Sequence, residues 1–190
     1  VFCGIMDQFA SIFGKEGHVT KLDCRDLSYE YYPFTNNNID IVLCDTKVKH
    51  TLASSEYNIR RSECEKGVSI LQRVFPTVKS LRDVTPAMLE TVKDTMEQNV
   101  YLRCRYVIHE IIRVEQACCA LSQNDFIQLG KLMYETHEGL SHEYEVSCQE
   151  LDILVNIARN TPDVLGSRMM GGGFGGCTIN LVKDSGIDVF

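Results

Sequence analysis

Residues 168–182 read Arg-Met-Met-Gly-Gly-Gly-Phe-Gly-Gly-Cys-Thr-Ile-Asn-Leu-Val, with five glycines around one phenylalanine. Glycine loses more backbone entropy on folding than any other residue, so such a dense run is costly. A chain tolerates the run where the backbone needs positive φ, or where another segment or a ligand approaches too closely for a Cβ. Apolar, β-prone flanks favour two strands joined by a folded turn over a flexible linker. We call Gly171, Gly172, Gly173, Phe174, Gly175 and Gly176 the glycine turn.

The residues of the glycine turn leave two interpretations open. The turn is either a structural hairpin or a loop packed against an active site that handles phosphate or sugar. It matches neither the Walker pattern nor the dinucleotide-binding fingerprint, because no Lys-Ser or Lys-Thr pair follows and the spacing differs.

The composition excludes several classes of partner. Among 190 residues, 26 are acidic and 19 basic, and the net charge of −7 disfavours nucleic acid and anionic membranes as partners. No apolar run approaches the ~20 residues that cross a bilayer. The sequence opens on Val-Phe-Cys-Gly, without a methionine or a basic leader, so we expect a fragment that lacks a signal peptide.

Nine cysteines are scattered along the chain, an odd number without a Cys-x-x-Cys pair. Most lie inside apolar stretches. This pattern favours reduced, buried thiols in a cytoplasmic protein, and it disfavours a zinc site or a disulfide framework.

The N-terminal part predicts one helix and three strands. Residues 4–14 have apolar side chains at helical spacing, while residues 19–24 and 29–34 alternate as two strands of a hairpin do. The apolar run 39–44 predicts a buried strand. The composition changes at the asparagines 36–38, which mark a candidate domain boundary.

Helical patterns dominate the rest of the chain up to the strands around the glycine turn. Thr85 before Pro86 predicts a capped helix start, and capping boxes are expected at Asp125 and Ser147. A strand, several helices and a returning strand pair predict an α+β fold, with helices on one face of a mainly antiparallel sheet. We expect helices near residues 54–75, 86–96, 99–121, 126–140 and 148–158.

Two polar groups are candidates for chemistry. Asp7 lies between glycine and apolar neighbours, which suits a partly desolvated carboxylate for acid–base work or cation binding, or simply a surface aspartate at a helix start. Residues 45–61 hold small hydroxyl side chains, followed by Tyr57 at the start of a helix. They either contact a polar ligand or form a solvated, capped helix.

Three remote segments, GIMDQFAS, LASSEYNIRR and SRMMGGGFGGC, occur here in one order. That order resembles the galactokinase family, within the GHMP superfamily of small-molecule kinases. The sequence YEVSCQELD, residues 144–152, extends the resemblance, which covers nearly the whole chain. Residues Asp45-Thr46 and Gln149 depart from the residues that family members often have, and neither departure affects a proposed role.

The resemblance implies a role for each candidate residue. Asp7 falls on the catalytic aspartate, Gly4 on a glycine whose backbone contacts the sugar, and Tyr57 on a tyrosine whose hydroxyl binds it. The glycine turn falls on a loop beside the active site that supports the catalytic segment and the phosphate region. The resemblance also implies the ferredoxin-like C-terminal domain of the GHMP kinase fold.

The implied reaction transfers the terminal phosphoryl group of ATP to the C1 hydroxyl of galactose, with Mg²⁺ bridging the phosphates. Such transfers depend mainly on alignment and charge neutralisation. Aspartate is a weak base for a hydroxyl group, so Asp7 acts either as a true base or as an orienting group.

The resemblance implies that residues 1–35 end an N-terminal catalytic domain and residues 36–190 form the C-terminal domain. The ATP-phosphate loop, an assisting arginine and part of the sugar site are then expected upstream, with further strands downstream. We expect the 190-residue piece to be inactive alone and to bind ATP at best weakly. No metal ligand is assigned, and a monomer is possible.

Three alternatives stay open on the sequence. The parent could be a sugar- and ATP-binding regulator that has lost catalysis, or a kinase for a related sugar such as N-acetylgalactosamine or arabinose. The least favoured alternative is a helix-rich interaction domain whose glycine turn is only a hairpin.

Overall fold

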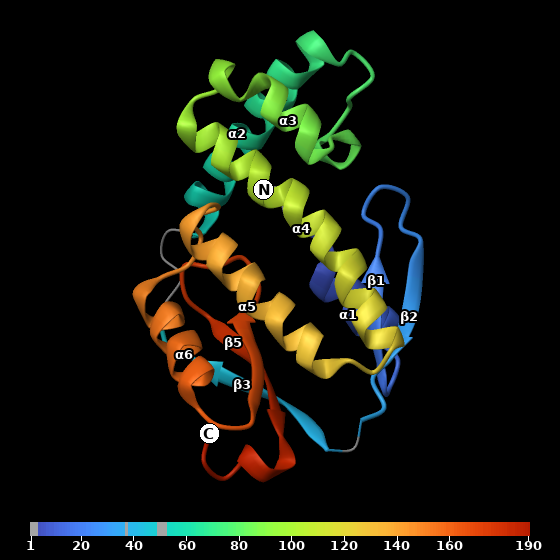
Figure 1. The fold of residues 1–190 in the computed structure, drawn as a ribbon, viewed down its shortest axis with the longest axis vertical. Helices are drawn as coiled ribbons and strands as arrows, with labels where there is room; N and C mark the ends of the chain where they lie inside the picture. The colour runs from blue at the N-terminus through green and yellow to red at the C-terminus, as the bar shows by residue number, and fades with distance from the viewer. Residues whose placement is uncertain (1–3, 37, 49–52) are drawn as a thin grey trace.

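The computed structural model describes residues 4–36, 38–48 and 53–190. An N-terminal helix and hairpin come first, followed by a strand, a helical region and a returning strand pair (Figure 1). The elements, in chain order, are α1 (Met6–Phe13), β1 (His18–Leu22), β2 (Tyr29–Pro33), β3 (Ile39–Asp45), α2 (Ala53–Val74), η1 (Leu81–Asp83), α3 (Pro86–Val92), η2 (Lys93–Thr95), α4 (Gln98–Ser122), α5 (Phe126–His142), α6 (Gln149–Asn160), β4 (Val164–Met169), β5 (Cys177–Lys183) and η3 (Asp184–Gly186).

The predicted N-terminal hairpin is confirmed. Strands β1 and β2 pair antiparallel, with Val19 opposite Tyr32. Helix α1 packs on this hairpin through aromatic rings, because the ring centroids of Phe9 and Phe13 lie 5.4 Å and 5.3 Å from that of Tyr29. The hairpin and α1 therefore form one small unit beside the larger sheet.

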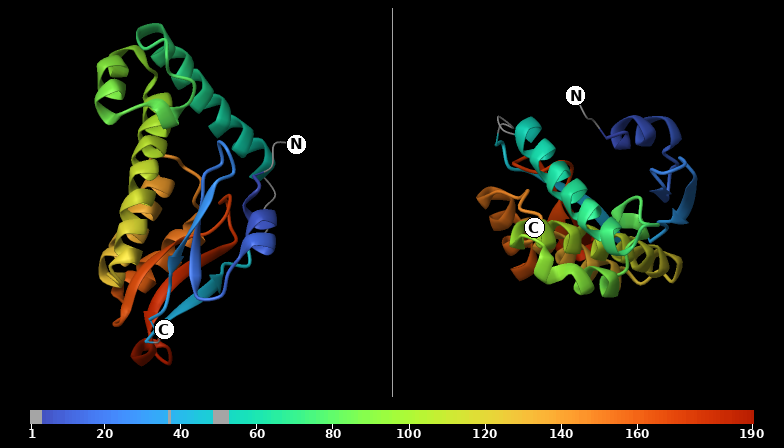
Figure 2. Two further views of the ribbon diagram at one scale, coloured as in Figure 1. Left: turned by 90° about the vertical axis from the view of Figure 1, so that its right-hand side faces the viewer. Right: turned by 90° about the horizontal axis from the view of Figure 1, so that it is seen from above.

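The larger sheet is antiparallel, in the order β3-β5-β4. Strand β5 is central, with Leu181 opposite Ile41 on β3 and Asn180 opposite Ser167 on β4. Helices α5 and α6 cover one face of this sheet, as the two views of Figure 2 show. The prediction of an α+β fold with an antiparallel sheet is confirmed.

The prediction that residues 39–44 form a buried strand is half wrong. The strand is present as β3, but Ile41 is 49% exposed and Leu43 is 54% exposed. Strand β3 lies at the edge of the sheet, and a short apolar run does not reveal whether its strand will be central or at an edge.

Helix α5 approaches the sheet closely where two glycines face each other. A Cβ built on Gly130 would lie 2.0 Å from the carbonyl oxygen of Leu165, and one on Gly166 would lie 2.3 Å from Gly130 Cα. Only glycine at both positions permits this backbone contact between α5 and β4.

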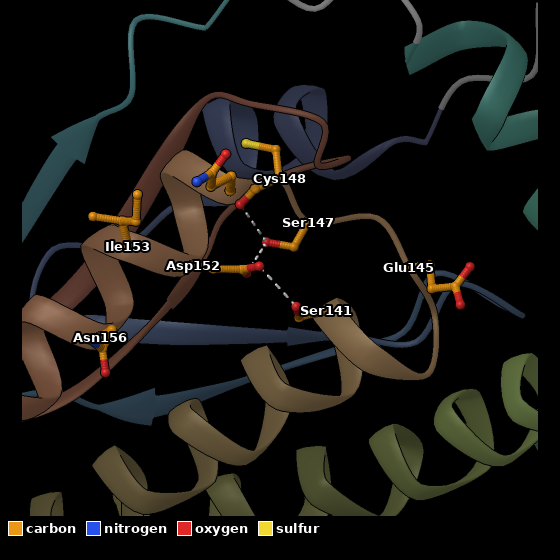
Figure 3. A pocket seen from close by; sticks show the side chains of 8 residues that line it. Ser141, Glu145, Ser147, Cys148, Asp152, Ile153 and Asn156 are labelled. Carbon is orange, nitrogen blue, oxygen red and sulfur yellow. Dashed lines mark hydrogen bonds between the residues drawn. The ribbon is translucent and has the colours of Figure 1, made fainter.

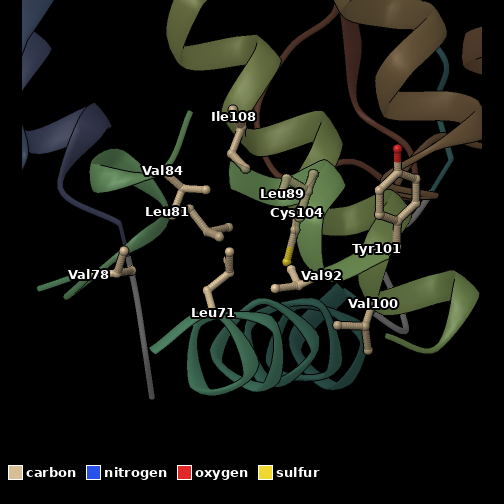
Figure 4. Packing of buried hydrophobic residues seen from close by; sticks show 10 residues of the cluster. All are labelled: Leu71, Val78, Leu81, Val84, Leu89, Val92, Val100, Tyr101, Cys104 and Ile108. Carbon is tan, nitrogen blue, oxygen red and sulfur yellow. The ribbon is translucent and has the colours of Figure 1, made fainter. Parts of the chain in front are cut away.

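A separate apolar core joins α2, α3 and α4 (Figure 4). Leu71 and Cys104 at its centre are fully buried, and burial raises the pKa of the Cys104 thiol to about 12. The predicted cap of α3 is confirmed, because the Thr85 hydroxyl accepts a hydrogen bond from the Met88 amide. The core residues are Leu71, Val78, Leu81, Val84, Leu89, Val92, Val100, Tyr101, Cys104 and Ile108.

The cysteines are less buried than the sequence predicted. Of the eight that the structure describes, all free thiols, only Cys104 and Cys118 are buried. Cys24 and Cys119 are exposed, because each occupies a position that faces away from the core. Across the described ranges, no helix combines the length and the hydropathy that a bilayer-crossing segment needs.

Candidate functional site

The glycine turn connects β4 to β5 in a left-handed backbone conformation. Phe174 has a φ of 60°, and Gly171, Gly173, Gly175 and Gly176 have φ values of 83°, 86°, 129° and 87°. L-residues other than glycine rarely adopt such angles. The predicted need for positive φ is therefore confirmed.

Two other segments of the chain approach the glycine turn closely. A Cβ on Gly173 would lie 2.0 Å from the carbonyl oxygen of Val146, and one on Gly175 would lie 3.0 Å from that of Val48. The Phe174 amide donates to the Val146 carbonyl at 2.7 Å. At Gly173 and Gly175, the group that approaches the glycine backbone is therefore another segment of the protein and not a ligand.

The other end of the glycine turn is open. Gly171 and Gly172 are exposed, and a Cβ on either would meet no atom of the described residues within 4 Å. These two backbone positions are therefore accessible to a ligand, whereas Gly173 and Gly175 serve packing.

Thr46, one of the hydroxyl residues in the predicted ligand-contacting cluster, has a structural contact. Its amide and its Oγ1 both donate to the carbonyl oxygen of Gly176, at 2.9 Å and 2.8 Å. This pair of bonds ties the end of β3 to the glycine turn.

A polar network lies next to the end of β4, where the glycine turn begins, and Figure 3 shows its Ser141, Ser147 and Asp152 side chains. The Met169 amide donates to His137 Nδ1 at 3.2 Å, so the ring proton lies on Nε2, which donates to Asp152 at 3.1 Å. Ser147 and Ser141 also donate to the Asp152 carboxylate, at 2.6 Å and 3.1 Å. The network joins α5, α6 and the last residue of β4.

The predicted capping box at Ser147 is wrong. Helix α6 begins one residue later than expected, with Cys148 as its N-cap residue and no side-chain cap bond, and the Ser147 hydroxyl donates to Asp152. By contrast, the expected cap at Asp125 is confirmed, since its side chain accepts from the Gln128 amide.

We predict a pH-dependent loss of stability from His137, which is 4% exposed. Burial disfavours the charged ring more than Asp152 favours it, so the pKa of His137 lies below its ordinary value. In the unfolded chain the pKa returns to about 6.5, so folding stability is complete above about pH 6.5 and falls as the pH drops below it. Urea unfolding of the full-length protein from pH 7.5 to pH 5 measures the loss.

The matched variants for this prediction are His137→Gln and His142→Gln. His142 is an exposed residue on the same helix, so its replacement should leave the pH dependence of the unfolding midpoint unchanged. His137→Gln should flatten that dependence. Equal slopes in wild type and His137→Gln would contradict the assignment.

Asp7 lies in the first turn of α1, and Gly4 lies two residues before the helix. Both are exposed, and no residue of α1 is buried. Of the two alternatives for Asp7, the described residues therefore show an exposed aspartate at a helix start and not a partly desolvated carboxylate. Its backbone carbonyl accepts from the Ser11 hydroxyl at 2.8 Å.

Tyr57 lies on the second turn of α2 and is 44% exposed. It lines a groove of ≈ 710 Å³ together with Arg61, Cys64, Tyr144 and Arg82. The structure does not describe residues 49–52. It also does not describe the side chains of residues 53–55, which include the hydroxyls of Ser54 and Ser55 in the predicted ligand-contacting cluster.

The candidate residues lie on three separate elements. Figure 2 shows α1, the first turns of α2 and the tip of the β4–β5 hairpin on the same side of the molecule. Convergence of Asp7, Tyr57 and the glycine turn on one pocket stays a prediction.

Residues 116–187 match the family model described as GHMP kinases C terminal. This part of the chain is therefore similar to the C-terminal region of GHMP kinases. The matched region runs from the end of α4 through α5 and α6 to the glycine turn and β5. Asp7 and Tyr57 lie outside it, so the GHMP kinase match alone covers only one of the three candidate elements.

Curated relatives extend the similarity to the whole chain. The chain is 44% identical to galactokinase of Homo sapiens over 96% of its own length and 45% of the relative's. It is 45% identical to galactokinase of Thermotoga maritima over 96% of its own length and 50% of the relative's. The chain therefore spans about half the length of the curated relatives it matches.

Two solved kinase structures are also similar to this chain. The crystal structure of Lactococcus lactis galactokinase complexed with galactose matches all of this chain and 49% of its own, with a TM-score of 0.92 and 32% sequence identity. Mevalonate kinase of L. major, complexed with R-mevalonate, matches 90% of this chain and 42% of its own, at a TM-score of 0.53 and 21% identity, which shows a shared fold.

The sequence analysis missed the residues that support the glycine turn, His137 and Asp152. Asp152 looked like one of two acidic residues in the first turn of α6, Glu150 being the other. Ser147 and Asp152 both lie in the sequence YEVSCQELD, but nothing in that sequence indicates the contact of Asp152 with His137 on another helix.

Proposed function

We propose that this chain is the C-terminal part of a galactokinase, which transfers the terminal phosphoryl group of ATP to the C1 hydroxyl of galactose. The observation that carries the proposal is similarity over the entire chain to the galactokinase–galactose complex, at a TM-score of 0.92. Identities of 44% and 45% to two curated galactokinases support it.

Asp7 is proposed to act at the C1 hydroxyl, as a base or an orienting group. Gly4 and Tyr57 are proposed to bind the sugar, through a backbone group and a hydroxyl respectively. Their exposure in this chain supports the proposal, because a residue that binds a ligand must be accessible to it. The open positions Gly171 and Gly172 supply the part of the glycine turn that a ligand can approach.

The chain's own contribution to the reaction is alignment. Tyr57 would hold the sugar hydroxyls, and Asp7 would accept or orient the hydrogen of the attacking hydroxyl. Bound Mg²⁺ would neutralise charge on the ATP phosphates. Mg²⁺ is often held by one or two carboxylates plus substrate phosphates, and no residue of this chain is assigned to it.

We further propose that residues 1–35 belong to the catalytic domain and residues 36–190 to the C-terminal domain. Two separate sheets support this division, since β1 and β2 pair with each other whereas β3 pairs with β5. The chain alone is proposed to be inactive and to bind ATP at best weakly. Micromolar ATP affinity of the isolated chain in calorimetric titration would contradict this.

The test is phosphoryl transfer by the full-length protein. With ATP and Mg²⁺, we expect turnover of galactose in a coupled assay of ADP release, and product phosphorylated at C1 by NMR. N-acetylgalactosamine and arabinose are compared in parallel, and a preference for either would reassign the sugar. Binding of galactose and ATP without any turnover would favour the regulator and overturn the proposed activity.

A further inference from the structure

Two buried guanidinium groups meet beside the turn that joins α5 to α6. Arg60 on α2 is 8% exposed and Arg103 on α4 is 3% exposed. Glu63 lies between them, with its Oε2 3.3 Å from Arg60 Nη1 and 3.1 Å from Arg103 Nε. A shared carboxylate offsets the repulsion between two like charges in the interior. We call Arg60, Glu63 and Arg103 the arginine clamp.

The arginine clamp binds the backbone of the α5–α6 turn. Arg60 donates to the carbonyl oxygens of Tyr144 at 2.7 Å and Glu145 at 3.1 Å. Arg103 donates to the Glu143 carbonyl, and to the Glu145 carboxylate at 2.6 Å. Glu145 has a φ of 52°, a conformation that its own side chain disfavours. The clamp therefore stabilises a backbone shape that this residue does not prefer.

The residue after this strained position supports the glycine turn. The Val146 carbonyl oxygen accepts a hydrogen bond from the Phe174 amide at 2.7 Å. The same oxygen would lie only 2.0 Å from a Cβ built on Gly173. Interiors are closely packed, so a shift of the α5–α6 turn is transmitted to the glycine turn.

At its other end, the clamp holds the start of α2. The side chains of Tyr57, Asn58 and Ile59 are exposed, whereas Arg60 is buried. Arg60 is therefore the buried anchor nearest to Tyr57 along the described part of this helix. Tyr57 also lines the same groove as Tyr144, whose carbonyl oxygen Arg60 binds.

We propose that Arg60 is a positioning residue, which sets the Tyr57 hydroxyl at a fixed distance from the glycine turn through the backbone of residues 143–146. The proposal rests on the proposed function, in which Tyr57 binds the sugar and the glycine turn supports the phosphate region. A lysine at position 60 keeps the charge but lacks the planar fork that bonds two carbonyls at once. Arg60→Lys therefore tests position rather than charge.

The kinetic experiment is a double-mutant cycle in the full-length protein. Arg60→Lys is expected to lower kcat/KM for galactose by about tenfold, because misplaced binding groups lose alignment. In a Tyr57→Phe background the same substitution should cost less than about twofold, since the hydroxyl that Arg60 positions is gone. Arg73→Lys, an exposed change on the same helix, is the control and should have no effect.

A second measurement does not depend on activity. Uniform 3-fluorotyrosine labelling gives a ¹⁹F resonance for Tyr57, which Tyr57→Phe assigns by its disappearance. The resonance should shift in Arg60→Lys and stay in place in Arg73→Lys. If wild type fails to phosphorylate galactose, the proposed function fails, while this measurement still tests the positioning role.

Glu63→Gln is a second variant of the arginine clamp, and urea unfolding shows whether each variant folds. Glu63→Gln keeps the shape of the side chain and removes the charge between the two guanidinium groups, so it should move the same resonance. Additive kinetic losses in the cycle would overturn the proposal, as would a Tyr57 resonance unchanged by both Arg60→Lys and Glu63→Gln.

Discussion

In the full-length protein, Asp7→Asn is expected to lower kcat for galactose phosphorylation by about 10²–10⁴-fold, the usual contribution of a positioned acid–base group. Asparagine keeps the shape and one acceptor oxygen of the carboxylate, but it loses the charge and the ability to take a proton. Galactose binding should survive, because Tyr57 and the backbone at Gly4 are unchanged. Steady-state kinetics and calorimetric titration with galactose measure the two effects separately.

Glu16→Gln is the matched control for Asp7→Asn. Glu16 is another exposed acidic residue close to α1, so the variant removes one negative charge from the same region without touching Asp7. It should turn over galactose as wild type does. Equal turnover in Asp7→Asn and wild type would remove Asp7 from the mechanism.

The second large effect is expected from Gly173→Ala, which should destabilise the protein by about 2–4 kcal/mol and abolish most of its activity. Two costs add at this position. The residue has a φ of 86°, and its Cβ would lie 2.0 Å from the Val146 carbonyl oxygen, a backbone atom that cannot swing away. Urea unfolding and the galactose assay report the two effects.

The same turn provides its own control. Gly172 has no positive φ, and a Cβ there meets no described atom within 4 Å. Gly172→Ala should therefore keep the stability of wild type, while any loss of activity would report a ligand that approaches this open position. Equal destabilisation by Gly172→Ala and Gly173→Ala would contradict the roles of positive φ and close approach at Gly173.

Features that depend on a few neighbouring residues were predictable. The positive φ values of the glycine turn follow from steric limits on each residue, and the Thr85 and Asp125 caps follow from short side chains beside free amides. The order of the hairpin, the helices and the closing strands was readable for the same reason. The roles of Asp7, Gly4 and Tyr57 came from resemblance and remain proposals.

Contacts between remote residues were not predictable from the same patterns. Ser147 looked like a cap because its local spacing fits one, yet its hydroxyl binds Asp152 in the folded protein. The exposure of Ile41 depends on the place of β3 at the edge of the sheet, which pairing with β5 decides. Asp152 lies only five residues after Ser147, but its other partner His137 and the strand β5 lie outside a short sequence window.

The sequence by itself indicated positive φ within residues 171–176, and five of these six residues adopt it, because the steric limit on φ arises within each residue. Only the tertiary structure decided which atoms fill the space that the missing side chains leave: the Val146 carbonyl at Gly173, and Val48 at Gly175. It also brought Arg60 to the Tyr144 carbonyl, 84 positions away along the chain. Such contacts depend on how the helices pack, and packing is a property of the whole chain and not of a local pattern.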